Sequence, residues 1–223
     1  MRSQEFIIED DEEFERDVNV IQQAYNMTGV DVQFALSVRN KCRTYLEEVN
    51  FRPCSEYGLY RGLQNANADY VSKKIRTQDR NPKDSTKQLH TLLNKFYTEN
   101  FGANFRDAMF CTGSYELAQE FGQAYTIFPV GDFKYLWDMD SKDIYVEFLN
   151  YARKSNIKAE GPEYTTQIAE AFIEDVISKH TFDSTDLMTA IKRGHEIMIR
   201  GKSYLACRVS NTIEKGIEEI CKL

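Results

Sequence analysis

The chain has 223 residues, of which 42% are hydrophobic and 13% aromatic, so it is long enough to bury a sizeable core in a single domain. Its 28 basic and 35 acidic residues give a net charge of −7. This balance argues against a general nucleic-acid-binding protein, because phosphate contacts need a basic face, although it leaves room for a local basic patch.

The first 50 residues are predicted to be mainly helical. Residues 1–10 indicate a loose segment or a short strand. Apolar residues then recur at helical spacing from Phe14 to about Asn26 and again from Val32 to Val49. Pro53 is expected to end this helical block.

Short strands alternate with helices in the middle of the chain. The strands are predicted at 57–63, 108–112, 125–130 and 133–137, the last of them at a sheet edge. The helices are predicted at 65–74, 87–100 and 115–121, and Ser85 or Thr86 is expected to cap the second of these.

The last third returns to helices, with a pair of strands inserted. Helices are predicted over 141–153 with Ser141 as cap, over 162–179, up to about Arg193 with Asp183 or Ser184 as cap, and over 209–221. The stretch GHEIMIRGKSYLA, residues 194–206, predicts two strands joined by a turn at Gly201. The whole pattern is α+β, and its irregular alternation argues against a doubly wound parallel sheet.

Five cysteines form no CxxC pair, which favours a reducing compartment with the thiols as small buried hydrophobic groups. Three histidines without an HExxH pattern predict no structural zinc site. The N-terminus lacks the apolar run of a signal peptide, and no segment is long enough to cross a bilayer. We therefore expect a soluble intracellular protein.

Several common catalytic motifs are missing from the sequence. It contains no GxxxxGK[ST], no GxGxxG after a strand and no GxSxG. A nucleophilic Cys–His pair stays open as an alternative, since such a pair is formed in space and not in sequence.

Three predicted strands each carry a polar group beside or near a glycine: Arg61 in YRG, Thr112 and Ser114 in FCTGS, and Glu196 in GHE. Each group has an ordinary structural explanation. These are a salt bridge or a snorkelling arginine, turn-forming or helix-capping hydroxyls, and a solvated acid. The functional alternative for Arg61 is a guanidinium that clamps a phosphate or a carboxylate.

The order of these groups resembles the Arg–Ser–Glu arrangement of ADP-ribosyltransferases, and the motifs are most similar to those of the bacteriophage enzymes. The matching segments are Tyr60-Arg61-Gly62, Thr112-Gly113-Ser114-Tyr115 and Glu196-Ile197-Met198-Ile199, and the resemblance extends from about Tyr57 to Arg208.

This resemblance implies an α+β fold with a split β-sheet ADP-ribosyltransferase-like core at 55–210. A helical segment at 1–50, inserted helices and a C-terminal helix at 209–223 would complete a single domain, 1–223. It implies that NAD is a substrate bound between two small sheets, with no metal. The family reaction breaks the bond between nicotinamide and ribose and passes through an oxocarbenium ion, which a fixed carboxylate stabilises.

The resemblance also assigns roles to residues. Glu196 would bind the 2′-hydroxyl of the nicotinamide ribose, Arg61 would hold a phosphate or ribose of NAD, and Ser114 with Thr112 would position Glu196 and the ribose. The implied catalytic set is Glu196, Arg61 and Ser114, and the implied NAD-binding set is Arg61, Gly62, Thr112, Ser114 and Tyr115. Either Tyr115 or Phe121 could stack on nicotinamide, although a place in the core is the simpler expectation for both.

One position departs from the family pattern. Many members that modify arginine carry a second acid two residues before the catalytic glutamate, and this chain has Gly194 there. Arginine is therefore a poor guess for the acceptor. In a regular strand His195 would project away from Glu196.

The loop 76–86 carries Arg76, Arg80 and Lys83. It is expected to be solvated, or else to engage the acceptor or an NAD phosphate.

We expect a phage-encoded enzyme of host takeover that transfers ADP-ribose from NAD to a host protein or nucleic acid. It would act in the host cytoplasm, with carriage in the virion left open and no membrane association. The alternative is an inactive protein of this fold that serves as a virion component or binds a host protein. A third hypothesis is an unrelated α+β domain in which the motifs are coincidental.

Overall fold

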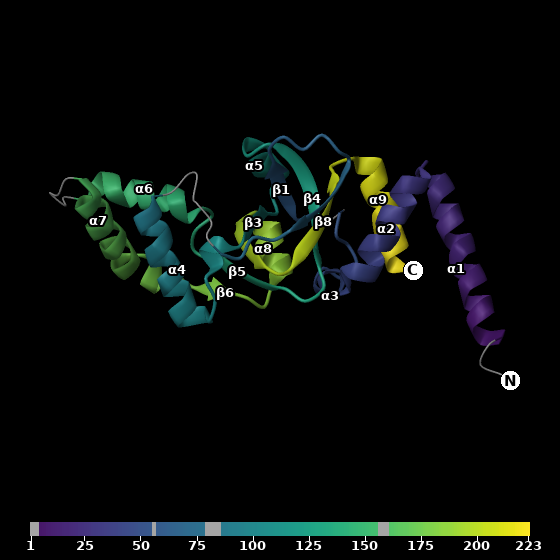
Figure 1. Ribbon diagram of the computed structural model, residues 1–223, viewed down its shortest axis with the longest axis horizontal. Coiled ribbons are helices and arrows are strands. Elements are labelled where there is room, and N and C mark those ends of the chain that lie inside the picture. Colours follow the sequence, from purple (N-terminus) through teal and green to yellow (C-terminus); the bar gives the residue numbers. More distant parts are fainter. Residues whose placement is uncertain (1–4, 55–56, 79–85, 156–160) are drawn as a thin grey trace. The chain divides into compact units, whose positions relative to one another are not determined.

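The computed structural model describes residues 5–54, 57–78, 86–155 and 161–223 (Figure 1). These residues form two compact units. The first unit comprises 1–73, 115–132 and 203–223, and the second comprises 74–114 and 133–202. Each unit is described by itself below. The expected single domain stays a prediction.

The first unit contains the two ends of the chain. Its helices are α1 (Glu5–Ala24), α2 (Gly29–Lys41), α3 (Arg43–Glu48), α5 (Tyr115–Glu120) and α9 (Asn211–Lys222). Its strands are β1 (Tyr60–Leu63), β2 (Tyr70–Lys74, whose last residue is counted with the second unit), β4 (Gln123–Val130) and β8 (Ser203–Arg208).

The strands of the first unit follow the order β2-β8-β4-β1, and β4 pairs antiparallel with both β1 and β8. Helices α2 and α9 lie side by side (Figure 1). Phe128 of β4 lies at the centre of an aromatic contact, with Phe34 of α2 and Tyr45 of α3 against its ring. Burial of these rings joins the helices to the sheet.

The second unit is built from the two middle parts of the chain. Its helices are α4 (Lys87–Phe101), η1 (Phe105–Asp107), α6 (Ile144–Lys154), α7 (Gly161–Asp175), η2 (Ile177–Lys179) and α8 (Leu187–Arg193). Its strands are β3 (Met109–Thr112), β5 (Lys134–Asp138), β6 (Phe182–Asp183) and β7 (Glu196–Arg200).

The strands of the second unit follow the order β3-β7-β5-β6, and all of these pairs are antiparallel. Phe110, Met198 and Leu136 lie opposite one another on neighbouring strands and form one row across the sheet. This row packs in a hydrophobic cluster with residues of α4, α6 and α7, the three helices grouped at one side of Figure 1. The face that carries Met198 is therefore covered by helices.

The mixed α and β content and the antiparallel strand pairing confirm the α+β expectation at this level. Helices were predicted correctly at 87–100, 115–121 and 209–221, and strands at 57–63, 108–112 and 125–130. Helix α1 ends close to the predicted point, but it begins at Glu5, so the prediction of a loose segment or strand was wrong for residues 5–10.

The predicted helix 32–49 is interrupted at Cys42, which separates α2 from α3. Cys42 has φ −114° and ψ 26°, outside the helical range, and its buried thiol donates to the carbonyl oxygen of Phe128 at 3.6 Å. A packing contact with β4 therefore overrides an otherwise continuous helical pattern.

The helix predicted over 65–74 was wrong, because the chain there turns and forms β2. Backbone oxygens of the segment are used by neighbouring strands: the Tyr125 hydroxyl donates to the carbonyls of Ala66 and Ala68, and an Arg208 guanidinium nitrogen donates to that of Asn67. Tertiary hydrogen bonds thus determine the conformation of a segment whose sequence gives only a weak helical pattern.

Segment 133–137 forms a strand as predicted, but β5 does not lie at a sheet edge, since it is flanked by β7 and β6. The predicted caps of two helices were also wrong. Asp143, not Ser141, accepts from the first turn of α6, and Asp186, not Asp183 or Ser184, caps α8. The helix predicted over 162–179 ends earlier, at Asp175, and a 3₁₀ turn follows it.

The two strands predicted in GHEIMIRGKSYLA are confirmed as β7 and β8, but they do not pair with each other. Strand β7 pairs with β3 and β5 in the second unit, and β8 pairs with β4 in the first. Consecutive strands therefore serve different units, with the boundary at Ser203.

All five cysteines are buried and free, which confirms the expectation of unpaired, buried thiols. Burial raises the pKa of Cys42 and of Cys221 to about 12, so these thiols stay protonated near neutral pH. In the described part of the chain, no helix combines the length and the apolar character that crossing a bilayer requires.

Thr86 caps α4, with its hydroxyl oxygen accepting from the backbone N–H of Leu89 at 3.2 Å. We predict that Thr86→Ala lowers the free energy of unfolding by about 1 kcal/mol, because a helix-terminal donor loses its partner. Urea unfolding measures the change. Thr98→Ala is the matched control, since Thr98 is exposed on the same helix and its hydroxyl donates within that helix. An equal loss in both variants would contradict the capping role.

Glu214 is a buried acid in α9 that accepts hydrogen bonds from the Thr126 hydroxyl and from the backbone N–H of Ser210. Burial raises the pKa of Glu214 above its ordinary value of 4.5. The unfolded chain therefore releases this proton at lower pH than the folded chain does. The folded protein is therefore most stable, as far as Glu214 is concerned, when the pH is below about 4.5. This contribution to the free energy of unfolding is lost as the pH rises from about 4.5 through the pKa of the folded state.

We predict that Glu214→Gln becomes progressively more stable relative to the wild type as pH increases above about 4.5. Unfolding free energies measured from pH 4 to pH 8 test this difference. Glu120→Gln, an exposed acid in α5, serves as control and should give a curve parallel to the wild type. A parallel curve for Glu214→Gln would show that its burial does not set the pH dependence.

Candidate functional site

Glu196 opens strand β7 and lies directly opposite Thr112, the last residue of β3. Two residues further along, Met198 lies opposite Phe110 in the hydrophobic cluster. Because side chains alternate along a strand, Glu196 and Met198 share the helix-covered face. Glu196 and Thr112 thus form a polar pair next to the apolar pair of Met198 and Phe110. The Glu196 side chain is 26% exposed.

The Thr112 hydroxyl joins the two motifs of this unit. It donates to the carbonyl oxygen of Gly194 at 3.0 Å and accepts from the backbone N–H of Ser114 at 3.1 Å. The segment before Glu196 is therefore fastened to the end of β3. Thr112 holds the backbone two residues ahead of Glu196.

Gly113, between the two hydroxyl residues, is required by a close backbone approach. A Cβ atom added there would lie 1.8 Å from the carbonyl oxygen of Ile191, in the last turn of α8. Only glycine lets β3 end this close to α8.

Gly194 ends helix α8 in the left-handed conformation, with φ 66°. A Cβ atom there would lie 3.5 Å from the Cβ of Ser114, so Ser114 lies against this glycine. Gly194 therefore serves as a helix cap, outside β7, and the position carries no side chain toward a substrate.

His195 lies away from Glu196, as a regular strand predicts. The Nδ1 atom of its buried ring is 2.7 Å from the carbonyl oxygen of Asp138, and Trp137 packs edge-on against the ring. The backbone N–H of Glu196 donates to the carbonyl oxygen of Lys142 at 3.1 Å. The start of β7 is held by the turn that follows β5.

Arg106 is the cation beside Glu196. One of its terminal guanidinium nitrogens donates to Oε1 of Glu196 at 3.2 Å, and only 9% of the arginine side chain is exposed. The centre of the guanidinium lies 4.7 Å from the centroid of the Phe110 ring. This charge is therefore shared between an anion and an aromatic face.

The short helix η1, which carries Arg106, is tied to β7 at two points. Arg106 binds Glu196, and the neighbouring Asn104 accepts from Arg200 through its backbone oxygen, at 2.8 Å, and through its side chain. Glu196 and Arg200 lie on either side of Met198 on one face. The helix η1 thus lies along that face of β7.

Side chains of α4 also hold this segment. The backbone N–H of Arg106 donates to the side-chain oxygen of Asn94 at 2.9 Å. The buried His90 ring lies 2.9 Å from Asp107, whose other carboxylate oxygen accepts from Asn104 at 2.7 Å. The position of Arg106 is consequently fixed by a polar network that extends from α4 to β7.

Tyr97 of α4 adds an unusual group near this network. Its side chain is fully buried, and its hydroxyl has no hydrogen-bond partner among the described residues. Burial raises the pKa of this hydroxyl well above its usual value. The Arg106 charge opposes this rise, and the charges of Glu196 and Asp138 add to it. The tyrosine is therefore a neutral phenol close to the ion pair.

The other predicted site residues belong to the first unit. Arg61 lies on β1 opposite Tyr125 of β4 and is half-buried. Gly62 permits a close approach, since an added Cβ would lie 2.3 Å from the carbonyl oxygen of Ala118. Tyr115 packs edge-on against Tyr60, with ring centroids 5.9 Å apart.

The structure thus brings Thr112, Ser114 and Glu196 together in one unit. Arg61, Gly62 and Tyr115 lie in the other, where Phe121, the second stacking candidate, is 49% exposed.

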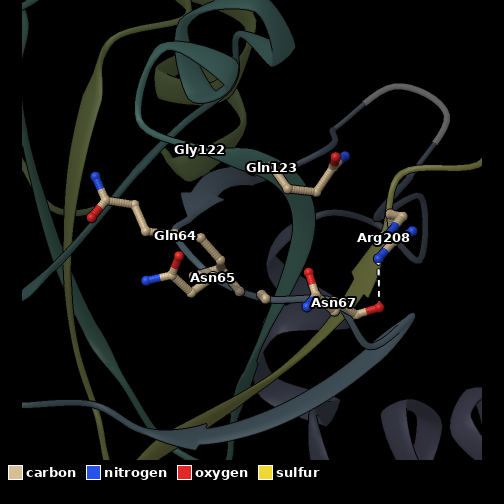
Figure 2. Close-up of a pocket in the computed structure, with 8 residues that line it drawn as sticks. Gln64, Asn65, Asn67, Gly122, Gln123 and Arg208 are labelled. Atoms are coloured by element: carbon tan, nitrogen blue, oxygen red, sulfur yellow. Dashed lines mark hydrogen bonds between the residues drawn. The ribbon is translucent and has the colours of Figure 1, made fainter.

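A cavity of about 540 Å³ in the first unit is lined mainly by polar residues (Figure 2). Its lining includes Gln64, Asn65, Asn67, Gln123 and Arg208. Figure 2 shows Gln64 and Gln123 extending away from each other, and Arg208 turned toward the backbone oxygen of Asn67, to which it donates at 2.7 Å. These side chains do not converge on one point, so this cavity is a weaker candidate than the Glu196 region.

Sequence reasoning missed Arg106 and Tyr97. Arg106 and Asp107 form a charged pair immediately before an apolar strand, and such a pair ordinarily indicates a solvated turn.

In the loop 76–86, Arg76 is exposed, while Arg80 and Lys83 lie outside the described residues.

Among the described residues, no group of three or more His, Cys, Asp or Glu is placed to hold a metal ion. Comparison of the chain with protein-family models, with curated proteins and with solved structures gives no match.

We predict that Gly113→Ala lowers the free energy of unfolding by at least about 2 kcal/mol, because the added methyl group meets the backbone of α8 and one of the two must move. Urea unfolding provides the measurement. Gly29→Ala is the control, since a Cβ atom at Gly29 meets nothing within 4 Å. If Gly113→Ala were as mild as Gly29→Ala, the close approach of β3 to α8 would be incorrect.

Proposed function

We propose that this chain transfers ADP-ribose from NAD to an acceptor on a host macromolecule, as a phage-encoded enzyme. The observation that carries the proposal is the pairing of Thr112 with Glu196 at adjacent ends of β3 and β7. The two motifs are far apart in sequence, and the family resemblance requires them to meet. A coincidental match would give no reason for that juxtaposition.

The chemistry that this arrangement supports is cleavage at C1′ of the nicotinamide ribose. The C1′–N bond breaks, and its electron pair leaves with nicotinamide. The cation that develops on the ribose is captured by a nucleophile of the acceptor, which loses its proton to solvent. In this scheme Glu196 binds the ribose 2′-hydroxyl and stabilises the developing positive charge.

The half-buried setting of Glu196 suits this role. Its side chain is 26% exposed and lies at the end of a helix-covered apolar row. A carboxylate that is partly withdrawn from water interacts more strongly with a nearby cation than one on the open surface does. It is also still accessible to a substrate.

The proposal extends to the fold, as a split β-sheet core of the ADP-ribosyltransferase type. What supports it is the coarser observation of mixed α and β content with antiparallel strand pairs. In the proposal Arg61, Gly62 and Tyr115 keep the NAD-binding roles that the family resemblance implies. Ser114 lies against Gly194 and positions the ribose close to Glu196.

We infer that arginine is not the acceptor. Gly194 stands where many arginine-modifying enzymes carry an acid, and it ends α8 with φ 66°. A position used as a left-handed helix cap has no side chain with which to deprotonate or orient a nucleophile.

The proposal predicts that Glu196→Gln reduces the rate of NAD-dependent labelling by at least ~10²-fold, since an amide cannot stabilise a cation as a carboxylate does. Purified protein is incubated with radiolabelled NAD and bacterial lysate, and both label incorporation and nicotinamide release are followed. Glu99→Gln, an exposed acid on α4, is the matched control and should keep the wild-type rate. Wild-type labelling with no loss in Glu196→Gln would refute the role of Glu196.

The second candidate is a catalytically inactive protein of the same fold, acting as a virion component or a binder of a host protein. Two observations favour it: Glu196 is already paired with Arg106, and Gly194 has no side chain. This candidate predicts no nicotinamide release by the wild-type protein in the same assay.

A further inference from the structure

We propose that Arg106 is a positioning residue for Glu196, holding the carboxylate in the orientation in which it meets the ribose. The inference rests on the proposed function, and it assigns to that reaction a residue that the Arg–Ser–Glu motifs do not contain. It begins from the hydrogen bond between the guanidinium and Oε1 of Glu196, 3.2 Å long.

Arg106 is suited to this role because it is itself immobile. Its side chain is 9% exposed, its guanidinium stacks on Phe110, and its backbone N–H is held by Asn94. A surface arginine loses rotamer freedom when it forms an ion pair, which leaves such pairs weak. Here folding has already fixed the arginine, so the carboxylate meets a preformed partner.

Both α4 and β7 support the segment that carries Arg106. Asp107 is bound to His90 of α4, and Asn104 is bound to Arg200 of β7. Arg200 and Glu196 lie on the same strand face, so β7 holds the segment at Asn104 and Arg106, while α4 holds it at Asp107. A displacement of Arg106 along β7 would break contacts at both ends.

Fixing Glu196 in advance has a direct chemical effect. A glutamate side chain loses conformational freedom when it is held in one rotamer, and this loss costs free energy. If the folded protein holds it, that cost is not taken from the binding of NAD or of the transition state. The partial neutralisation of the carboxylate by Arg106 acts in the opposite direction, so positioning is the property to be measured.

The nearby orphan groups fit this description. The Nε atom of Arg106 and the Tyr97 hydroxyl are both buried without a hydrogen-bond partner among the described residues. Unsatisfied polar groups are uncommon in protein interiors and are often retained for a functional reason. The arginine keeps its bond to Glu196 although its burial leaves Nε unsatisfied.

The test is a double-mutant cycle on nicotinamide release from NAD in the presence of bacterial lysate. We expect Arg106→Met to lower kcat on the order of 10²-fold with little change in the KM for NAD, because orientation matters most in the transition state. In the Glu196→Gln background the same change should alter the residual kcat by less than about threefold, since the carboxylate to be positioned is gone. Arg106→Lys should fall between the wild type and Arg106→Met, because it keeps the charge but not the planar stack.

Two measurements separate positioning from a loss of structure. Arg153→Met removes an exposed arginine from α6 of the same unit and should keep the wild-type kcat. A thermal unfolding curve is measured for every variant, to check that each variant is folded at the assay temperature. A purely structural role predicts that Arg106→Met lowers kcat by the same factor with and without Glu196, and that result would overturn the assignment.

The failure of the proposed function gives a different result. If the wild-type protein releases no nicotinamide, the reaction and the role of Arg106 in it are both refuted. If the wild type and Arg106→Met are equally active while Glu196→Gln is not, only the role of Arg106 is refuted.

Discussion

The candidate site depends on the antiparallel register of β3 and β7, which places Thr112 opposite Glu196. A slip of one residue would turn Glu196 to the other face of the sheet, because side chains alternate along a strand. Two local features oppose such a slip. The Thr112 hydroxyl binds the backbone of Gly194, and Gly113 brings the end of β3 against the backbone of Ile191. The same glycine-containing motif therefore supplies the hydroxyl groups and fixes the register that makes them useful.

This register also sets the environment of the carboxylate. Met198 anchors one end of the face in a hydrophobic cluster, and Glu196 follows at the point where helical cover ends. Full burial of an unpaired carboxylate would be costly, and full exposure would leave it with little influence on a nearby cation. Glu196 is instead half-buried and paired with Arg106, a buried cation whose own position is fixed by α4 and β3. Half-burial and pairing are thus two parts of one electrostatic arrangement.

Local patterns in the sequence were sufficient for elements whose signals are local. The Thr86 cap and the apolar stripe of α4 predicted that helix within a residue, and the short apolar run before Gly113 predicted β3. The pattern failed where distant contacts decide the conformation. Carbonyl groups of 66–68 accept hydrogen bonds from side chains of β4 and β8, and the Cys42 thiol is bound to a carbonyl of β4. In the same way, Glu196 and Thr112 could be selected from their motifs, whereas Arg106 could not, since its role exists only once η1 lies along β7.

Under the proposed function, the conformation of Gly194 restricts which acceptors the protein can modify. A side chain two residues before Glu196 could orient a nucleophile only if that position lay in the strand and carried a polar group. Here Gly194 is the left-handed cap of α8, and Ser114 packs against it. Replacing this glycine by an acid would strain the backbone at φ 66°, so the fold itself opposes the arrangement used for arginine. Under the proposed function, an acceptor must therefore bring its own nucleophile into position, through contacts made elsewhere on the protein, and Glu196 is left to act on the ribose alone.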